Sequence, residues 1–438
     1  MEVSIGIRRE DKNRWERRSP IIPDHVKQLI REHNFHFVVQ PGSIRVFSES
    51  EYKNAGADIS EDLSTCSAIF AVKEIPQNLI LKNKVYIFFS HTIKGQSYNM
   101  SMLQKLLDQK CTLIDYELIV DKTGRRLVFF GNYAGLAGMI DSFWALGQRL
   151  HVEGFTTPFL NIQPAHKFTD LHEAKESLIR IGEQIKTSNL PAKLCPMIFG
   201  FAGYGNVSRG AQEIFDLMPY KEINARDLVS NNIKNLSGRN LLYKVVFKEE
   251  DTVVPKVEGK SFDLKEYYSF PDRYVSRFKE YIPFLTILMN CIYWEPKYPR
   301  LVSKQNIKDL FKSPHSPALR VIGDISCDVN GSIECTLKCT TPENPVYVYD
   351  SKLDASIDGV KGMGPVILAI DHLPCELPKE SSEFFSKSLL PYIPIIAGTD
   401  YSRAFADLAL EPIIKNALII HQGQLTPRFT YLEKYLRQ

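Results

Sequence analysis

Two short apolar runs, each ending at an ionisable residue, constrain the fold of this chain more than any other feature. Residues 67–72 lead into Lys73, and residues 85–90 lead into His91. Runs of this length and composition are typical of buried strands in a parallel sheet. Residues at the carboxyl ends of such strands line the crevice of an open α/β sheet. The sequence therefore predicts a lysine and a histidine in one crevice, an arrangement suited to acid–base chemistry near neutral pH.

Residues 1–132 alternate between strand-like and helix-like segments. Besides the two runs above, strands are expected at 3–7, 35–40 and 112–116, and helices at 20–31, 49–55 and 101–109. The first of these helices would open with Ser19 as its cap and Pro20 in its first turn. Alternation of this kind predicts parallel βαβ units and hence an α/β fold.

The size and charge of the chain exclude several classes of protein. Its 438 residues are enough for about two to three domains of ordinary size. The net charge is only +3, so neither a nucleic-acid partner nor a membrane-surface patch is expected. No apolar run approaches the ~20 residues that a membrane-spanning helix needs. The composition is that of a globular protein with large cores.

The cysteines and the N-terminus favour a reducing compartment. Cys335 and Cys339 stand without a second pair, so no zinc site is expected among the eight cysteines. Free thiols are the simplest interpretation. The first residues lead directly into the strand at 3–7, without a secretory or organellar leader. We expect a cytoplasmic protein, with a mitochondrial location as the alternative if a presequence lies outside this sequence.

A glycine-rich turn between an apolar strand and a helix indicates a dinucleotide-binding domain. Residues 196–202 lead into the spacing Gly-x-Gly-x-x-Ser, and a helix is expected over 209–217. The first glycine allows a tight turn, and the second lets the backbone approach a pyrophosphate at the helix N-terminus. The residues predicted to bind the cofactor here are Gly203, Gly205, Asn206, Val207 and Ser208. The alternative is a glycine turn without a ligand.

The choice of dinucleotide is less clear from the sequence. About 20 residues after the turn, an acidic residue normally binds the ribose hydroxyls of NAD. Arg226 lies near that place, where a 2′-phosphate would be bound, and this favours NADPH over NADH. Glu222 or Asp227 could instead fill the NAD role.

The remaining segments complete the second domain. Strands are expected at 286–292, 318–325 and 366–370, and helices at 381–389 and 401–416. The polar pair Asp371–His372 follows the last strand. The charged residues 230–280 are interpreted as a surface insertion.

Small residues at 131–138 open a long apolar helix and are interpreted as a hinge, with plain close packing as the alternative. We therefore predict two Rossmann-like, doubly wound parallel-sheet domains with a cleft between them. A substrate-binding and catalytic domain would comprise 1–132 and 379–438. The dinucleotide-binding domain would comprise 133–378, including the insertion.

Several motifs together resemble one family. These are residues 8–20, the Lys73 and His91 segments, 115–117, 124–126, the Gly203 turn and 371–374. In this order they resemble lysine–ketoglutarate reductase, the N-terminal half of the bifunctional aminoadipic semialdehyde synthase of plants and animals. Lysine-forming saccharopine dehydrogenases and, more remotely, alanine dehydrogenases and transhydrogenases share the pattern. Two departures are the absent glutamate-forming dehydrogenase half and Tyr204, which replaces a smaller residue in the glycine turn.

The resemblance implies the first step of lysine degradation. L-lysine and 2-oxoglutarate would condense, and NADPH would reduce the imine to saccharopine, which a separate saccharopine dehydrogenase partner could then oxidise. It implies Lys73 as base and His91 as proton donor. It further implies carboxylate binding by Arg18, Arg125 and Arg126, residues Glu74 and Glu117 beside the base, and Asp371 near the nicotinamide. The guanidinium fork suits a carboxylate because it forms two parallel bonds.

Other interpretations remain open. Lys73 or Arg18 could be a surface residue, and His91 could be a structural histidine. Arg125 and Arg126 follow a turn glycine and could be solvated, while Glu74 and Asp371 could have structural roles. The chain could also be an alanine-dehydrogenase-like enzyme that uses NADH and ammonia, or a non-catalytic regulatory homologue. Fold alone does not decide among these.

Overall fold

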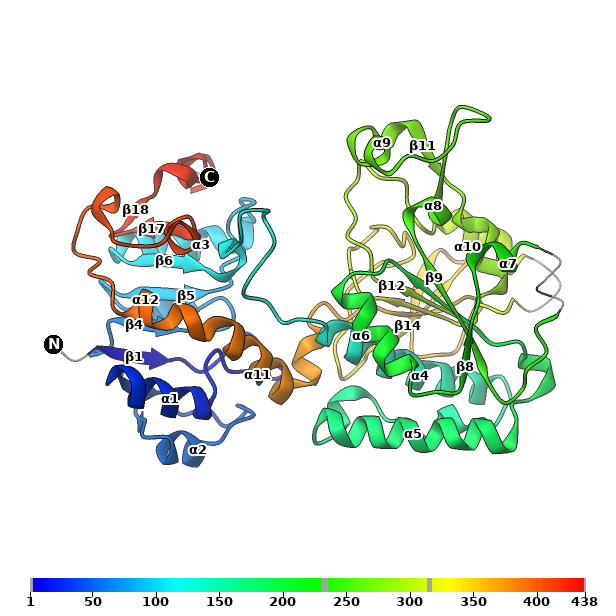
Figure 1. Cartoon of the computed structure of the whole chain (residues 1–438), viewed down its shortest axis with the longest axis horizontal. Coiled ribbons are helices and arrows are strands. Elements are labelled where there is room, and N and C mark those ends of the chain that lie inside the picture. Colours follow the sequence, from blue (N-terminus) through cyan, green and yellow to red (C-terminus); the bar gives the residue numbers. More distant parts are fainter. Residues whose placement is uncertain (1–2, 231–232, 234, 313–316, 437–438) are drawn as a thin grey trace. The chain divides into compact units, whose positions relative to one another are not determined.

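The chain forms two compact units. The computed structural model describes residues 3–230, 233, 235–312 and 317–436. Unit 1 comprises Met1–Gly131 and Pro378–Gln438, and unit 2 comprises Asn132–Leu377 (Figure 1). In the part of the chain that is described, no helix is both long and apolar enough to cross a membrane.

An eight-stranded sheet forms the centre of unit 1. Its strands are β1 (Ser4–Ile7), β2 (His36–Val39), β3 (Asp58–Ile59), β4 (Ala68–Phe70), β5 (Val85–Phe88), β6 (Thr112–Asp115), β17 (Leu418–His421) and β18 (Gln424–Leu425). Their order is β18-β17-β6-β5-β4-β1-β2-β3. Strands β1 to β6 are parallel, and β17 and β18 add an antiparallel edge. The parallel core confirms the α/β class predicted from the alternating pattern.

The helices of unit 1 flank this sheet. They are α1 (Pro23–His33), α2 (Glu49–Asn54), α3 (Ser97–Asp108), α11 (Pro378–Leu389), α12 (Ile393–Ala397), α13 (Pro412–Lys415) and α14 (Glu433–Leu436). Helix α1 begins at Pro23, one turn later than the sequence suggested. Helix α2 begins at a capping box, in which Ser48 and Glu51 exchange side-chain-to-backbone hydrogen bonds.

The C-terminal segment is built into unit 1. The backbone N–H of Ser19 donates to Ser382 Oγ at 3.0 Å, and that of Ile22 donates to Ser386 Oγ at 3.1 Å, so α11 is joined to the N-terminal segment. The helix expected over 401–416 is largely absent, and a single 3-10 turn at Phe405–Asp407 and the short α13 form there. Pro412 explains the difference, because proline lacks the N–H that an interior helical position needs and therefore sits at the start of α13.

A second eight-stranded sheet forms unit 2. Its strands are β7 (Ile198–Ala202), β8 (Tyr220–Glu222), β9 (Leu242–Phe247), β12 (Ile287–Asn290), β13 (Val321–Asp324), β14 (Val346–Asp350), β15 (Ala355–Asp358) and β16 (Val366–Leu368). Their order is β15-β14-β16-β13-β12-β7-β9-β8, and only β14 and β15 are antiparallel to their neighbours. Apolar cores cover both faces of this sheet.

The interpretation of 230–280 as a surface insertion is partly wrong. Strand β9 lies inside the sheet, hydrogen-bonded to β7 on one side and β8 on the other. Lys244 concealed it, because a lysine interrupts the apolar pattern. Its ammonium is buried beside Asp216, at 2.7 Å, and lies over the ring of Tyr220. Residues 231, 232 and 234 of this segment lie outside the described residues.

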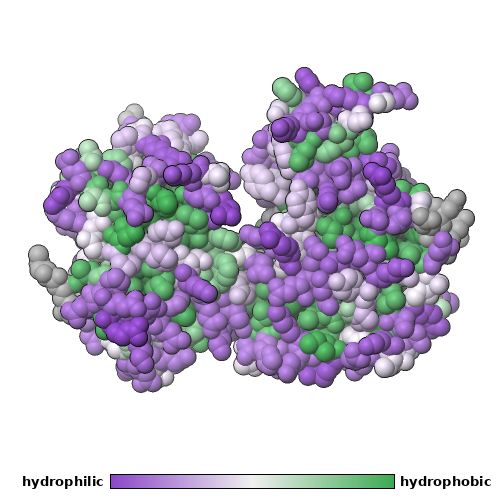
Figure 2. All heavy atoms as spheres, in the orientation of Figure 1, coloured by the Kyte–Doolittle hydropathy of each residue, from purple (hydrophilic) through white to green (hydrophobic). Residues whose placement is uncertain are grey.

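After β9 the chain does form a peripheral segment. The short strands β10 (Val253–Pro255) and β11 (Tyr274–Ser276) pair with each other, and α9 (Leu264–Ser269) lies between them in sequence (Figure 1). Apolar side chains are exposed on this segment among hydrophilic ones (Figure 2); they are Val257, Leu264, Phe270 and Val275.

The helices of unit 2 are α4 (Tyr133–Val152), α5 (Leu171–Ser188), α6 (Asn206–Phe215), α7 (Ala225–Leu228), α8 (Glu249–Thr252) and α10 (Lys304–Phe311), besides α9. The small residues at the start of α4 allow it to pack closely on α6. A Cβ on Gly135 would lie 1.9 Å from the carbonyl oxygen of Val207, and one on Gly210 would lie 2.2 Å from that of Asn132. This part of 131–138 therefore serves close helix packing.

Candidate functional site

The Lys73 and His91 segments leave two neighbouring strands at the same edge of the sheet in unit 1. Lys73 lies three residues after the end of β4, and His91 lies three residues after the end of β5. The two strands are parallel, with Phe70 paired to Ile87. Both side chains are half-buried. The tertiary structure thus places the two predicted catalytic residues just beyond the carboxyl ends of adjacent parallel strands.

Glu74 connects the histidine to a second cation. Its carboxylate lies 2.7 Å from His91 Nδ1 and 2.8 Å from Lys12 Nζ. Burial disfavours the charged form, but the bonds from His91 and Lys12 outweigh burial and lower the pKa of the Glu74 carboxyl below its usual range. Glu74 therefore stays charged near neutral pH.

This contact determines the tautomer of His91. A carboxylate can only accept hydrogen bonds, so Nδ1 must carry a proton. The Nε2 atom has no hydrogen bond to any described residue, so it can accept or donate a proton toward solvent or substrate. The backbone of His91 is left-handed, with φ of 47°, and Asn99 Nδ2 donates to the carbonyl oxygens of Ser90 and His91 at 3.0 and 3.3 Å. Backbone strain of this kind is common at functional sites.

A buried carboxyl holds the backbone of the lysine segment. The Glu10 carboxylate accepts hydrogen bonds from the backbone N–H groups of Val72 and Lys73, at 2.7 and 2.9 Å between nitrogen and oxygen. Burial, together with the charge of Glu16, raises the pKa of Glu10 to about 7, although these backbone bonds oppose the rise. The Lys73 ammonium makes no hydrogen bond or ion pair with any residue that the structure describes. It is thus left available for a ligand.

Arg18 is deeply buried and already bound to a carboxylate. Its guanidinium forms a two-bond pair with Glu16, with Nε at 2.6 Å from Oε1, and it lies 3.8 Å from the centre of the Phe130 ring. A substrate carboxylate at Arg18 would share the guanidinium with Glu16.

The two other predicted carboxylate-binding arginines lie in a turn after β6. Arg125 is 79% exposed and pairs with Asp121, at 3.2 Å. Arg126 is half-exposed and pairs with Glu117. The turn therefore uses both guanidiniums in local pairs, and Glu117 contacts Arg126.

The sequence analysis missed three members of this cluster, namely Glu10, Lys12 and Asn99. Glu10 and Lys12 belong to the charged segment 8–20, whose density of ionisable residues was the available signal. Asn99 lies on α3 and carried no local signal. A hollow of about 280 Å³ borders the cluster and is lined in part by Lys12, Glu74 and Asn99.

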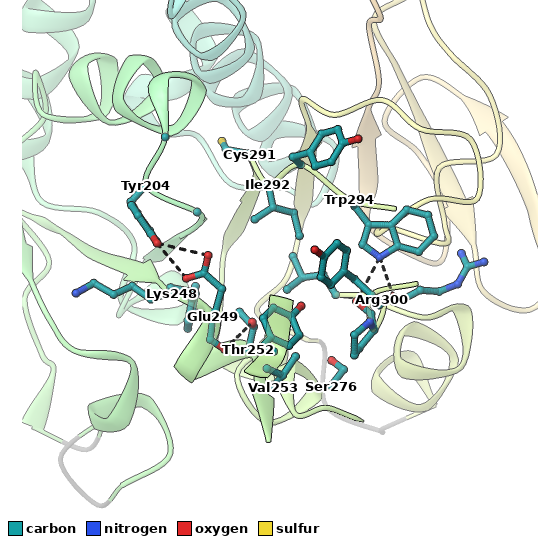
Figure 3. A pocket seen from close by; sticks show the side chains of 18 of the residues that line it. Tyr204, Lys248, Glu249, Thr252, Val253, Ser276, Cys291, Ile292, Trp294 and Arg300 are labelled. Atoms are coloured by element: carbon teal, nitrogen blue, oxygen red, sulfur yellow. Dashed lines mark hydrogen bonds between the residues drawn. The ribbon is translucent and has the colours of Figure 1, made fainter. Parts of the chain in front are cut away.

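In unit 2, the glycine turn borders a cavity of about 460 Å³ (Figure 3). Gly203 has φ of +92°, a conformation that favours glycine. Gly205 precedes α6, and a Cβ there would meet no atom within 4 Å, so its backbone faces open space. No side chain caps the first N–H groups of α6. An uncapped helix N-terminus beside an open glycine fits the pyrophosphate of a dinucleotide.

Four of the five predicted cofactor residues line this cavity, and they are Gly203, Gly205, Asn206 and Val207. Ser208 instead is buried and accepts a hydrogen bond from Gln212 Nε2 at 2.9 Å. The opposite wall comes from the segment after β9 and from residues 291–301. It is rich in aromatic side chains, among them Tyr268 and Tyr298 and Trp294, which Figure 3 labels.

Two further predicted cofactor residues do not line the cavity. Arg226 is exposed on α7, after β8 at the edge of the sheet, and its charge acts on Asp251. Asp371 follows β16 and contacts His372. Among the described residues, no group of histidine, cysteine or acidic side chains could hold a metal ion.

Comparison with known protein families gives a match near each end of the chain. The family described as alanine dehydrogenase/PNT, N-terminal domain, matches residues 6–137, and the corresponding C-terminal domain family matches residues 295–428. A solved L-alanine dehydrogenase shares the fold, with a TM-score of 0.63 and 16% identity over 99% of this chain and all of that one. A transhydrogenase from Sinorhizobium meliloti aligns with a TM-score of 0.52 and 14% identity, over 97% of this chain and all of that one.

More similar sequences are found among longer proteins. The alpha-aminoadipic semialdehyde synthase of Arabidopsis thaliana is 37% identical and the mitochondrial one of Rattus norvegicus is 36% identical, each over 98% of this chain. The chain spans 41% and 47% of these two relatives, or about half their length. A saccharopine dehydrogenase [NAD(+), L-lysine-forming] from Emericella nidulans is 27% identical over 88% of this chain and 90% of its own. The chain is therefore homologous to about half of the length of the alpha-aminoadipic semialdehyde synthases, and its two end segments match both domain families of alanine dehydrogenase/PNT.

Proposed function

We propose that this chain catalyses the reductive condensation of L-lysine with 2-oxoglutarate to saccharopine, with a reduced nicotinamide dinucleotide as cofactor. This is the first step of lysine degradation through saccharopine. The observation that carries the proposal is that Lys73 and His91 both follow the carboxyl ends of adjacent parallel strands, with a hydrogen bond between Glu74 and His91. The semialdehyde synthase and saccharopine dehydrogenase relatives support the substrate class.

Lys73 and His91 would divide the proton transfers. The ε-amine of lysine must lose a proton before it can attack the keto carbon, and Lys73 Nζ is the group that we propose to accept that proton. The resulting hydroxyl must leave as water, and His91 donates a proton to it from Nε2. The Glu74 carboxylate accepts a hydrogen bond from Nδ1–H of His91 and so stabilises the imidazolium form that donates from Nε2. The products are an imine and water.

Arginines would bind the substrate carboxylates. Arg18, Arg125 and Arg126 are the residues that we propose for this role, each by sharing or exchanging its present carboxylate partner. Exchange is easiest for Arg125 and Arg126, because exposed ion pairs contribute little free energy. Glu117 would be displaced from Arg126 in that exchange.

The cofactor would bind unit 2 at Gly203, Gly205, Asn206 and Val207, around the N-terminus of α6. When bound, its nicotinamide supplies the hydride that reduces the imine. Asp371, at the carboxyl end of β16, is proposed to lie near that ring. The family resemblance and the position of Arg226 favour NADPH. The saccharopine dehydrogenases of Emericella nidulans and Yarrowia lipolytica, in contrast, are named for NAD(+).

One assay tests the proposal. Oxidation of NADPH and of NADH is followed with lysine plus 2-oxoglutarate, and saccharopine is identified by mass spectrometry. We expect turnover that needs both substrates. Turnover with pyruvate and ammonia instead would favour an alanine dehydrogenase, which the two matched domain families keep as the second candidate. No turnover with either pair would favour a non-catalytic homologue.

A further inference from the structure

The strand order of unit 2 determines which residues can contact the adenosine ribose of a bound dinucleotide. In a Rossmann domain, this position follows the strand adjacent to the glycine-turn strand. The strand adjacent to β7 is β9, and β8, the next strand in sequence, lies at the edge. The residues after β9 are Lys248 and Glu249, and both line the cavity that contains the glycine turn. Arg226 follows β8 and does not line it.

The carboxylate of Glu249 is held in place by two tyrosines. Tyr268 donates its hydroxyl to Oε1 at 2.6 Å, and Tyr204 donates to Oε2 at 3.2 Å. Tyr204 belongs to the glycine turn itself, so this bond connects the turn to the end of β9 (Figure 3). It also gives a role to the large residue that departs from the family pattern.

The remaining acceptor sites of Glu249 suit ribose hydroxyls. A carboxylate has about four acceptor positions, and the two tyrosines leave some of them unused. The 2′- and 3′-hydroxyls of NADH are donors. A 2′-phosphate, by contrast, is anionic and accepts only, so it would be repelled by Glu249.

The cations of the cavity do not offset this repulsion. The side chain of Lys248 extends away from the Glu249 carboxylate in Figure 3. Arg300 donates to the carbonyl oxygen of Gly331 at 2.8 Å and lies over the ring of Trp294, at the other side of the cavity. The residues that follow Glu249 are also acidic, namely Glu250 and Asp251.

We infer that Glu249, positioned by Tyr204 and Tyr268, makes this chain select NADH over NADPH. This inference rests on the nicotinamide cofactor of the proposed function, and it does not depend on the identity of the substrates. It replaces the expectation that Arg226 selects NADPH.

Calorimetric binding of NADH and NADPH to the full chain, without substrates, tests this inference. We expect NADH to bind at least about 10-fold more tightly, the scale of a hydrogen bond to a charged group. E249Q keeps the size of the side chain but removes its charge, so NADPH should bind more tightly, NADH more weakly, and the preference should shrink about 10-fold. Y204F should shrink the preference for NADH by a smaller factor, since the Tyr204 hydroxyl only positions the Glu249 carboxylate.

The matched control is E250Q, the same substitution one residue later at an exposed position that does not line the cavity. It should leave the ratio of the two dissociation constants unchanged. Tighter binding of NADPH by the unmodified chain, lost in K248Q or R226Q, would overturn the inference while leaving the proposed function intact. Binding of neither nucleotide would overturn both.

Discussion

Replacement of Glu74 by glutamine tests the acid–base cluster most directly. The carboxylate is 90% buried and accepts a 2.7 Å bond from His91 and a 2.8 Å bond from Lys12. A hydrogen bond to a charged group contributes about 1.5–3 kcal/mol. The Lys12 pair adds less than about 1 kcal/mol, because Lys12 is 41% exposed. Glutamine keeps one acceptor oxygen, so we expect E74Q to lower the free energy of unfolding by about 2 kcal/mol.

The effect on turnover should be larger than this stability loss implies. Without the carboxylate, His91 loses the partner that fixes its tautomer and stabilises its imidazolium. We expect kcat to fall about 100-fold, the scale of a lost acid–base group, with little change in KM for the cofactor. Steady-state kinetics and urea denaturation of the same preparation measure the two effects.

The pH dependence supplies an independent check. Since the pKa of Glu74 is lowered in the folded chain, its contribution to stability is complete above the ordinary value of 4.5 and is lost as the pH falls below that value. The stability difference between the unmodified chain and E74Q should therefore be constant near neutral pH and shrink in acid.

A matched variant separates this role from simple loss of an ion pair. Glu61 pairs with Arg9 at 2.7 Å but is 64% exposed. E61Q should change stability by less than about 1 kcal/mol and leave kcat unchanged. If E74Q were destabilised as expected but retained full turnover, Glu74 would be a structural residue and the proposed orientation of His91 would be refuted.

Four further substitutions test other parts of the structure. K73M and H91Q should each lower kcat about 100-fold with little change in melting temperature; parallel loss of stability would indicate structural roles. Burial raises the pKa of Glu10 to about 7, so folding takes up a proton and stability falls as the pH rises from 4.5 to about 7; E10Q should remove that slope in denaturation series. G135A should destabilise unit 2 by at least about 3 kcal/mol in calorimetry, because its Cβ would meet the Val207 oxygen. Stabilisation, as alanine gives in an open helix, would contradict the close packing.

Much of the fold could be predicted because its signals are local. The apolar runs before Lys73 and His91 coincide with β4 and β5, and the glycine turn lies between β7 and α6. The resemblance that these motifs showed to semialdehyde synthases and alanine dehydrogenases is confirmed by the matches to both. Errors arose where a single residue interrupted a pattern, as Lys244 does in β9 and Pro412 does in the expected tail helix.

The composition of the candidate site was less predictable. Lys73 and His91 could be proposed from their places after strands, but nothing in the sequence paired Glu74 with His91 and Lys12 rather than with other charged residues. Such pairing depends on which side chains meet after the strands have been ordered. Lys12 and Glu74 are separated by 62 residues, and no periodic pattern spans that distance.

The sequence alone determined the class of fold, the strands that carry the ionisable residues and the glycine turn between β7 and α6, because each depends on the hydrophobic period and turn chemistry of a few consecutive residues. Only the tertiary structure decided that β9 lies beside β7 and that Glu249, rather than Arg226, follows the strand next to β7. Strand order is set by the packing of apolar faces across the whole sheet. A different strand order can therefore place a different residue next to a ligand, although every local motif stays the same.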